Sequence, residues 1–285
     1  MRANYRKEGL FMCELTGNPD TKAVIRHWYG RLGFPAEFDG EFYAALETVS
    51  VSPDLTPETF DWESQDGILN LMSVLYLCQG LKARYDELGI PEELLLDNLG
   101  DIVRWAKIWS ELKGQLYLGE LCWLKWHFRM RIFKLGRLQF LTGFARQDIP
   151  AAGVQEGDPV LEIHIPRCGP LDPQACKASL AAAPAFFAKY FPEHHWKCFT
   201  CNSWLLDDTL REILPASSNI RQFQDLFVPV SRVPSDAIAR FVFRWQATRE
   251  QVMEMPADTS LKKAILERYR RGGTFYASLG FIAKG

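Results

Sequence analysis

Apolar positions in the first 114 residues recur at helical spacing. The segment Ile68–Cys78 is apolar on most faces, as expected of a helix buried inside a bundle. Pro91-Glu92-Glu93 predicts a helix start, because proline suits the first turn and the two acids complement the positive end of the helix dipole. The apolar positions that follow predict an amphipathic helix with a tryptophan-rich core face: Ile102, Trp105, Ala106, Trp109 and Leu112.

After Gly114 the pattern changes to one typical of β structure. Gln115–Gly143 is rich in aromatic and branched residues, and a turn signal at Leu135-Gly136-Arg137 favours strands at least in its second half. Val160–Ile165 is the clearest strand, and Pro166 ends it. Further strands are predicted at Trp196–Leu206, Ile238–Phe243 and Thr274–Ile282.

Helices alternate with these strands. Asp172 as N-cap and Pro173 at the first helical position predict a helix to about Tyr190, which Pro184 should kink or divide. Three more helices are expected: a short one capped by Asp207 or Asp208 and ending at Leu214, one after Ser217-Ser218-Asn219, and one capped by Thr259-Ser260.

These elements predict an α/β (α+β) protein, with a mixed sheet and flanking helices preceded by a helical N-terminal domain. We expect the helical domain to span residues 1–114 and the sheet domain 115–285, with a boundary that lies as late as 145 if the aromatic stretch belongs to the first domain.

Composition narrows the functional classes. Of 285 residues, 47% are hydrophobic and 24% charged, as in globular chains, and the net charge of −2 argues against a dedicated nucleic-acid binder. The first nine residues lack the apolar core of a signal peptide, and the longest apolar stretch, Ile68–Leu81, is too short and too interrupted to span a membrane. Seven cysteines without framework spacing then indicate reduced thiols, so we expect a cytoplasmic protein that contacts neither nucleic acid nor membrane.

Charge is segregated along the chain. Glu37–Asp66 holds nine acids and no Lys or Arg, whereas Leu121–Gln147 holds no acid and six positive charges: Lys125, Arg129, Arg131, Lys134, Arg137 and Arg146. We interpret the basic stretch as a face that docks internally or is simply solvated. The alternatives are contact with phosphates, or with an RNA or protein partner.

The pair Cys198 and Cys201 resembles a metal or redox motif. On an extended strand, residues three apart point to opposite faces, so one ion cannot bind both thiolates and no metal is expected. As nucleophiles, Cys201 or Cys176 would need a base and a lowered pKa; otherwise they are small core residues.

Glu162 and His164 lie two residues apart on the clearest strand, and so share one face. A carboxylate and an imidazole placed together can act as general base and acid near neutral pH. The alternative is a partly buried histidine bonded to the backbone beside a solvated glutamate.

Several ordered motifs resemble a bacterial family of acyltransferase-domain proteins, whose members join a helical N-acyltransferase N-terminal domain to a GNAT-like C-terminal domain. The resemblance covers the chain from about Leu69. The motifs are Leu135–Phe140, Glu162–Pro166 followed by Gly169-Pro170-Leu171, Cys201–Leu206, Ser218-Asn219-Ile220 and a Gly-rich C-terminal segment. This chain has Asn202 where the family pattern leads us to expect histidine.

The resemblance implies transfer of an acyl group, acetyl by expectation, from acetyl-CoA or another acyl-CoA to a small-molecule amine or peptide. It implies Glu162 and His164 as catalytic residues, with Ser203 as a donor to the thiolate or carbonyl. Ser203 and Ser218 equally suit helix caps, and Tyr269 or Tyr276 are candidate acids for the departing thiol. The alternative is a non-catalytic GNAT-like module that binds a ligand or protein.

The loop Arg167–Asp172 lies where GNAT enzymes bind the CoA pyrophosphate, so the resemblance implies Ile165, Arg167, Gly169 and Leu171 as cofactor-binding residues. Two residues argue against ordinary binding: Pro170 removes an N–H donor and Asp172 adds a negative charge near the phosphates. The alternatives are a plain strand-to-helix turn, or CoA held by the basic residues Arg129–Arg137.

Overall fold

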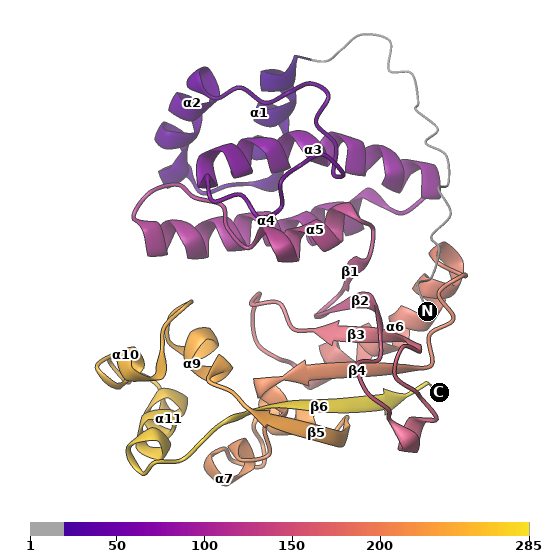
Figure 1. The fold of residues 1–285 in the computed structure, drawn as a ribbon, viewed down its shortest axis with the longest axis vertical. Coiled ribbons are helices and arrows are strands. Elements are labelled where there is room, and N and C mark those ends of the chain that lie inside the picture. Colours follow the sequence, from indigo (N-terminus) through magenta and orange to yellow (C-terminus); the bar gives the residue numbers. More distant parts are fainter. Residues whose placement is uncertain (1–19, 285) are drawn as a thin grey trace.

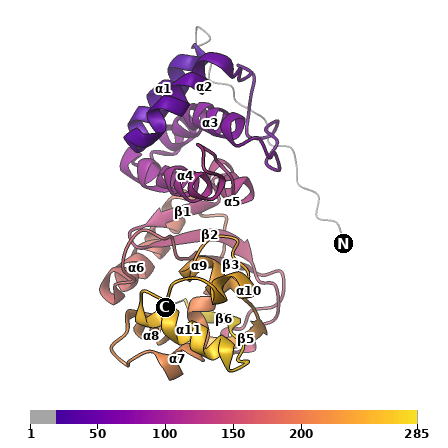
Figure 2. The same cartoon turned by 90° about the vertical axis from the view of Figure 1, so that its left-hand side faces the viewer.

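A computed structural model describes residues 20–284, and the first nine residues, examined above for an export signal, lie outside this range. The described chain begins with a helical part (Figure 1). This part consists of α1 (Thr21–Leu32), η1 (Ala36–Phe38), α2 (Asp39–Thr48), α3 (Gly67–Leu88), α4 (Glu92–Lys113) and α5 (Leu121–Phe128). Both views place α3 between α1 and α4, which explains why α3 is apolar on most of its faces (Figures 1 and 2).

The second part is built on a six-stranded sheet in the described residues, with order β1-β2-β3-β4-β6-β5. Its strands are β1 (Ile132–Leu135), β2 (Leu138–Phe144), β3 (Pro159–His164), β4 (Cys198–Ser203), β5 (Val228–Pro234) and β6 (Tyr276–Ala283). Only β3 and β4 run parallel in this sheet, and they pair at just two positions, Leu161 with Phe199 and Glu162 with Thr200. Both strands continue beyond the pairing, so the sheet opens at their carboxyl ends.

Helices flank this sheet. The connection from β3 to β4 is α6 (Pro173–Tyr190), and β4 leads through η3 (Trp204–Leu206) to α7 (Leu210–Ile213) and α8 (Asn219–Gln224). A lobe of α9 (Ala237–Val242), α10 (Arg249–Met253) and α11 (Ser260–Arg270) lies between β5 and β6, beside the open end of the sheet (Figure 1). The predicted fold class, a mixed sheet with flanking helices after a helical part, is confirmed.

The hydrophobic cores explain how these parts hold together. The main core runs without interruption from α1 through the helical part into the sheet and α6, so the two parts share buried surface. The lobe has a core of its own, centred on Ile238, Ile265 and Phe275. The lobe therefore folds around its own apolar side chains beside the open end of the sheet.

One local prediction was wrong, one was wrong in part, and one strand was missed. Ile238–Phe243 forms α9 rather than a strand, because Ile238 and Val242, one helical turn apart, both pack into the lobe core while Phe241 is exposed. Pro184 does not divide α6. We did not predict β5, an edge strand whose residues are mostly exposed and which therefore shows no alternation of apolar and polar positions.

Candidate functional site

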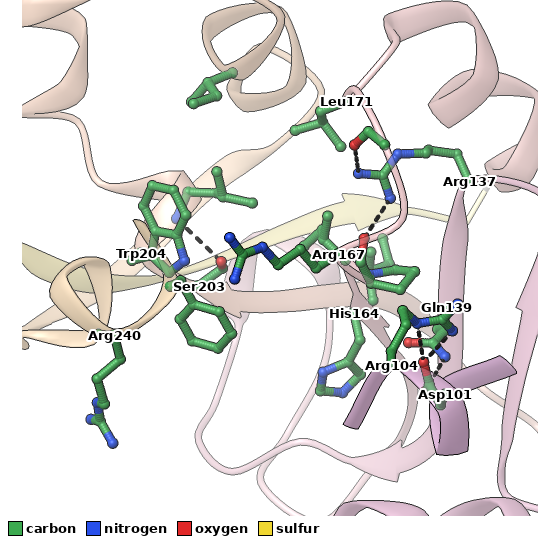
Figure 3. Close-up of a pocket in the computed structure, with 18 of the residues that line it drawn as sticks. Asp101, Arg104, Arg137, Gln139, His164, Arg167, Leu171, Ser203, Trp204 and Arg240 are labelled. Atoms are coloured by element: carbon green, nitrogen blue, oxygen red, sulfur yellow. Dashed lines mark hydrogen bonds and ion pairs between the residues drawn. The ribbon is translucent and has the colours of Figure 1, made fainter. Parts of the chain in front are cut away.

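A cavity of about 750 Å³ opens where β3 and β4 stop pairing (Figure 3). Crevices at the carboxyl ends of separating strands are common ligand sites, and this volume suits a small-molecule ligand. One end of the cavity, the loop end, is formed by the loop Pro166–Leu171 and the start of α8. The other, the helical end, is formed by Asp101–Ile108 of α4, Trp123 of α5 and His164 of β3, with α9 beside it.

Glu162 and His164 share one face of β3, as predicted. Nε2 of His164 lies 3.9 Å from Oε2 of Glu162. This Nε2 is buried and has no hydrogen-bond partner among the described residues, whereas a third of the side chain is open to the cavity. Nδ1 is therefore the ring nitrogen on the cavity side, and Glu162 stands behind the ring and outside the cavity lining.

The electrostatic surroundings keep His164 neutral. Burial lowers the pKa of His164 to about 4, Arg146 lowers it as well, and Asp101 opposes the change. Burial also raises the pKa of Glu162, against the pull of Arg146, whose Nη2 lies 3.7 Å from the Glu162 carboxylate. At neutral pH the imidazole is thus unprotonated and able to accept a proton from a group in the cavity.

Gly143 on β2 leaves the space that the carboxylate of Glu162 occupies. A Cβ atom on Gly143 would lie 2.2 Å from Oε1 of Glu162, so no larger residue fits there without moving the carboxylate. The close approach of the side chain to the β2 backbone thus directs Glu162 along the sheet toward His164.

At the loop end, one arginine holds the turn after β3. The guanidinium of Arg137 donates to three backbone carbonyls, those of Pro170 at 2.7 Å and of Pro166 and Gly169 at 3.1 Å (Figure 3). With these carbonyls turned toward Arg137, the backbone N–H groups of Arg167, Gly169 and Leu171 donate to no described residue. Such free N–H groups at a turn before a helix suit an anion.

Asp172 does not stand in this turn as a free charge. Its Oδ1 accepts a hydrogen bond of 2.8 Å from the N–H of Ala175 and so caps α6, with Pro173 next to it as predicted. Asp172 is also absent from the cavity lining. The Asp172 carboxylate, which argued against phosphate binding, therefore caps α6. Pro170, in contrast, does remove one backbone N–H donor from the turn.

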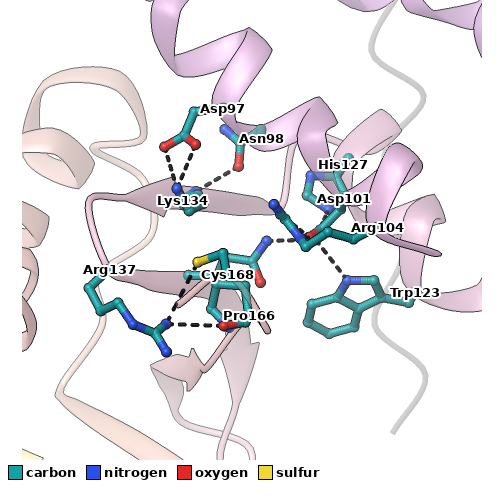
Figure 4. A network of polar contacts seen from close by, with 11 residues as sticks. Asp97, Asn98, Asp101, Arg104, Trp123, His127, Lys134, Arg137, Pro166 and Cys168 are labelled. Carbon is teal, nitrogen blue, oxygen red and sulfur yellow. Dashed lines mark hydrogen bonds and ion pairs between the residues drawn. The ribbon is translucent and has the colours of Figure 1, made fainter. Parts of the chain in front are cut away.

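The basic stretch Leu121–Gln147, interpreted as docked internally or solvated, is partly the one and partly the other. Lys134 is nearly buried and its Nζ lies 2.5 Å from Oδ1 of Asp97 on α4 (Figure 4). Arg131 stacks on Trp126 and bonds to Thr142, and Arg137 holds the loop. These three residues contact the protein itself, whereas Arg129 and Arg146 are exposed to solvent.

Four further polar side chains line the cavity: Asn202 and Ser203 of β4, and Ser218 and Asn219 at the start of α8. Oγ of Ser203 accepts from the N–H of Leu205 at 3.1 Å, and Oγ of Ser218 accepts from that of Ile220 at 3.3 Å, so both serines cap short helices. Their hydroxyl protons remain able to donate into the cavity.

Sequence reasoning missed the helical end of the cavity. We placed Trp105 on a core face; it packs against the main core but also lines the cavity, as does Trp123 of α5, which we did not single out. The sequence does contain a signal for this end. One face of α4 carries, at helical spacing, two charged residues among apolar ones: Asp101, Arg104, Trp105 and Ile108.

Other candidates lie away from the cavity. Cys198 and Cys201 are buried in different cores on opposite faces of β4, as predicted, and burial raises the pKa of Cys201, so it is not an activated nucleophile. Tyr269 is buried in the lobe with its hydroxyl 3.0 Å from Asp236, and Tyr276 is not among the lining residues.

Among residues 20–284 no group of three or more His, Cys, Asp or Glu side chains is arranged to hold a metal ion. Over the same residues, no helix has the length and hydropathy needed to cross a membrane.

Comparison with solved structures identifies the fold. An acyltransferase in complex with decanoyl-CoA and teicoplanin is 24% identical, with a TM-score of 0.74 over 91% of this chain and 87% of that one. An acyltransferase in complex with decanoyl-CoA is 26% identical, with a TM-score of 0.72 over 92% and 88%. A mutant acyltransferase in complex with octanoyl-CoA is 23% identical, with a TM-score of 0.76 over 96% and 91%. Among curated proteins, none matches this chain.

Family models cover almost the whole described chain. The N-acyltransferase N-terminal domain matches residues 36–130, and the GNAT-like C-terminal domain matches residues 132–282. The two matches meet where the helical part ends and β1 begins. The chain therefore belongs to the acyltransferase family that joins an N-acyltransferase N-terminal domain to a GNAT-like C-terminal domain.

Proposed function

We propose that this protein transfers an acyl group from acyl-CoA to an amine, with His164 as the general base. The observation that carries the proposal is the neutral imidazole at the point where β3 and β4 separate, with one ring nitrogen on the cavity side. Only an unprotonated amine attacks a thioester, so a base must first take up the ammonium proton. Nδ1 of His164 is free to accept it.

The proposed steps balance without a further reactant. The amine nitrogen forms a C–N bond to the thioester carbonyl and releases its second proton to solvent water, and the resulting tetrahedral intermediate collapses as the C–S bond breaks. The departing CoA thiolate takes back the proton held on the His164 imidazolium. Glu162 stabilises that imidazolium from behind, and the hydroxyl of Ser203 donates to the developing negative charge.

For the donor, we propose that the loop end takes the CoA phosphates. The N–H groups of Arg167, Gly169 and Leu171 point away from internal acceptors, and the guanidinium of Arg167 lines the cavity without an ion pair in the described chain (Figure 3). The side chain of Ile165 lines the passage from this loop toward His164.

For the acyl group, we propose a chain longer than the acetyl predicted from the sequence. Beyond His164 the cavity continues along apolar side chains of the helical end, including Trp105, Ile108 and Trp123, which a two-carbon acyl group would leave unfilled. Octanoyl- and decanoyl-CoA in the similar acyltransferases support this choice. The teicoplanin complex supports a peptide-like amine as acceptor.

Calorimetric titration with decanoyl-CoA, acetyl-CoA and free CoA tests the donor. We expect decanoyl-CoA to bind at least tenfold more tightly than acetyl-CoA, because eight further methylene groups enter an apolar site at a gross gain of about 0.8 kcal/mol each. Equal affinity would contradict the longer chain, and failure of all three to bind would contradict the proposed function.

Transfer is measured by mass spectrometry of teicoplanin and simple primary amines after incubation with the bound donor. His164→Gln should lower the rate at least a hundredfold with unchanged donor affinity, whereas the control His195→Gln, an exposed histidine outside this cavity, should not. Tight donor binding without transfer to any amine would favour the non-catalytic binding module.

A further inference from the structure

Asp101 on α4 is a buried carboxylate on which three elements converge (Figure 4). Its Oδ2 accepts from Nε2 of Gln139 on β2 at 2.6 Å and from Nε1 of Trp123 on α5 at 3.1 Å. Nε2 of His127, also on α5, lies 3.0 Å from the same oxygen, and Nε of Arg104 donates to Oδ1 at 2.8 Å. One carboxylate of the helical part thus fixes two side chains that flank the sheet.

Both of those residues are neighbours of the candidate base. The Trp123 ring stands edge-on to the His164 ring, with 4.7 Å between their centroids. Gln139 pairs with His164 in the register of β2 and β3, so it is the cross-strand neighbour of the imidazole. The ring has no hydrogen bond at Nε2 to hold it, and its orientation depends on these two neighbours.

We propose that Asp101 is a positioning residue for His164, which it orients through Trp123 and Gln139. The inference rests on the proposed function of His164. It assigns the helical part a role in the reaction. Asp101 on α4 bonds to residues beside the strand that carries the base, and it lies in the wall of the same cavity.

The charge of Asp101 is suited to this task. Burial disfavours the ionised carboxylate, but the contacts with His127, Arg104 and Gln139 outweigh burial, and the pKa of Asp101 lies well below its usual range. The carboxylate therefore stays ionised at any pH at which the enzyme is assayed, and its charge-assisted bonds hold Trp123 and Gln139 in one arrangement.

The test compares Asp101→Asn with Asp97→Asn. Asp97 lies one turn earlier on α4 and pairs with Lys134, so its variant loses an ion pair between the same two parts but keeps every hydrogen bond of Trp123 and Gln139 to Asp101; Lys134 is the cross-strand partner of Gln139 on β1, so the control also measures any disturbance passed along that pair. We expect Asp101→Asn to lower kcat about tenfold or more, because a misplaced base costs rate steeply. The KM for decanoyl-CoA should change less than about twofold in both variants, and Asp97→Asn should retain kcat.

A double-mutant cycle separates positioning from a general structural role. If Asp101 acts through His164, adding Asp101→Asn to His164→Gln lowers kcat no further. An equal loss in both backgrounds, or no loss in the single variant, would overturn the inference. If His164→Gln itself retains full activity, the proposed base is wrong instead, so the two failures are distinguishable.

NMR of the ring-labelled histidines provides a readout that needs no acceptor. The His164 signals are assigned by their loss in His164→Gln, and Trp123 shifts them through its ring current. We expect them to move in Asp101→Asn and in Trp123→Leu but to stay in place in Asp97→Asn. Unmoved His164 signals in a folded Asp101→Asn protein would also overturn the inference.

Discussion

The two ends of the cavity are built by opposite means. At the loop end, the groups proposed to bind the donor are backbone N–H groups and the guanidinium of Arg167, and one further side chain, that of Arg137, holds the turn through three carbonyls. At the helical end, the cavity-lining groups are side chains, and the carboxylate of Asp101 bonds to three of them, Arg104, Trp123 and Gln139. A backbone site depends on the shape of the turn, whereas a side-chain site depends on the identity of each residue. The loop end should therefore tolerate substitutions that the helical end does not.

Arg137→Met should produce the largest effect at the loop end. Methionine keeps the apolar stem but removes every bond to the carbonyls of Pro166, Gly169 and Pro170. The freed turn then samples other conformations, and donor binding must restore the one that presents the N–H groups. We expect the Kd for decanoyl-CoA to rise about tenfold or more, since each lost bond to a charged donor costs about 1.5–3 kcal/mol, with a smaller change in kcat.

Arg129→Met is the matched control, because Arg129 belongs to the same basic stretch but is exposed and lies outside the cavity lining. Calorimetric titration with decanoyl-CoA measures the Kd of both variants. Equal affinity of Arg137→Met and wild type would mean that the turn keeps its shape without the arginine, and the contrast between the two ends would fail.

The sequence predicts the parts of the site that depend on neighbouring residues in the chain, and it misses those that depend on contacts between distant elements. Alternation along one strand places Glu162 and His164 on one face, and capping rules place Asp172 at the start of α6, because both depend on residues close together in the chain. The Asp101 cluster joins residues 22, 26 and 38 positions apart, on two further elements. No local pattern reports such contacts; only the packing of α4 against α5 and against the β1–β2 hairpin creates them.

The prediction for Ile238–Phe243 failed for a related reason. A six-residue apolar run fits both the period of a strand and that of a helix, and the choice is made by what covers it. Here the lobe core buries Ile238 and Val242 together and leaves Phe241 at the cavity. For so short a segment, the tertiary contacts with the lobe, with Leu210 and with Trp204 decide the structure.

Arg146→Gln should have a moderate effect, confined to the pH dependence. The positive charge of Arg146 disfavours protonation of His164 and of Glu162, so its removal raises the pKa of both groups. The other charges facing His164, Glu162 beside it on β3 and Asp101 and Arg104 on α4, remain. The acidic limb of kcat/KM, set by the pKa of His164 near 4 in the wild type, should move to higher pH by about half a unit.

The shift from Arg146→Gln should shrink as salt is added, because the Arg146 side chain is 81% exposed and its field is screened. Arg129→Gln again serves as the control and should leave the profile in place. An acidic limb near pH 6.5 in the wild type, unmoved by Arg146→Gln, would show that a different group acts as the base.

Asp172 offers the smallest effect and the sharpest check on the loop end. Asp172→Ser keeps an oxygen that can cap α6 through the N–H of Ala175 but removes the negative charge, whereas Asp172→Ala removes both. We expect Asp172→Ala to lower the free energy of unfolding by about 1 kcal/mol and Asp172→Ser by only a few tenths, as measured by urea titration. Because the carboxylate is bound to the helix and stays outside the cavity lining, Asp172→Ser should leave the Kd for decanoyl-CoA within about twofold of wild type. A tenfold gain in affinity would instead mean that the charge repels the CoA phosphates from beneath the turn, and that this end depends on a side chain after all.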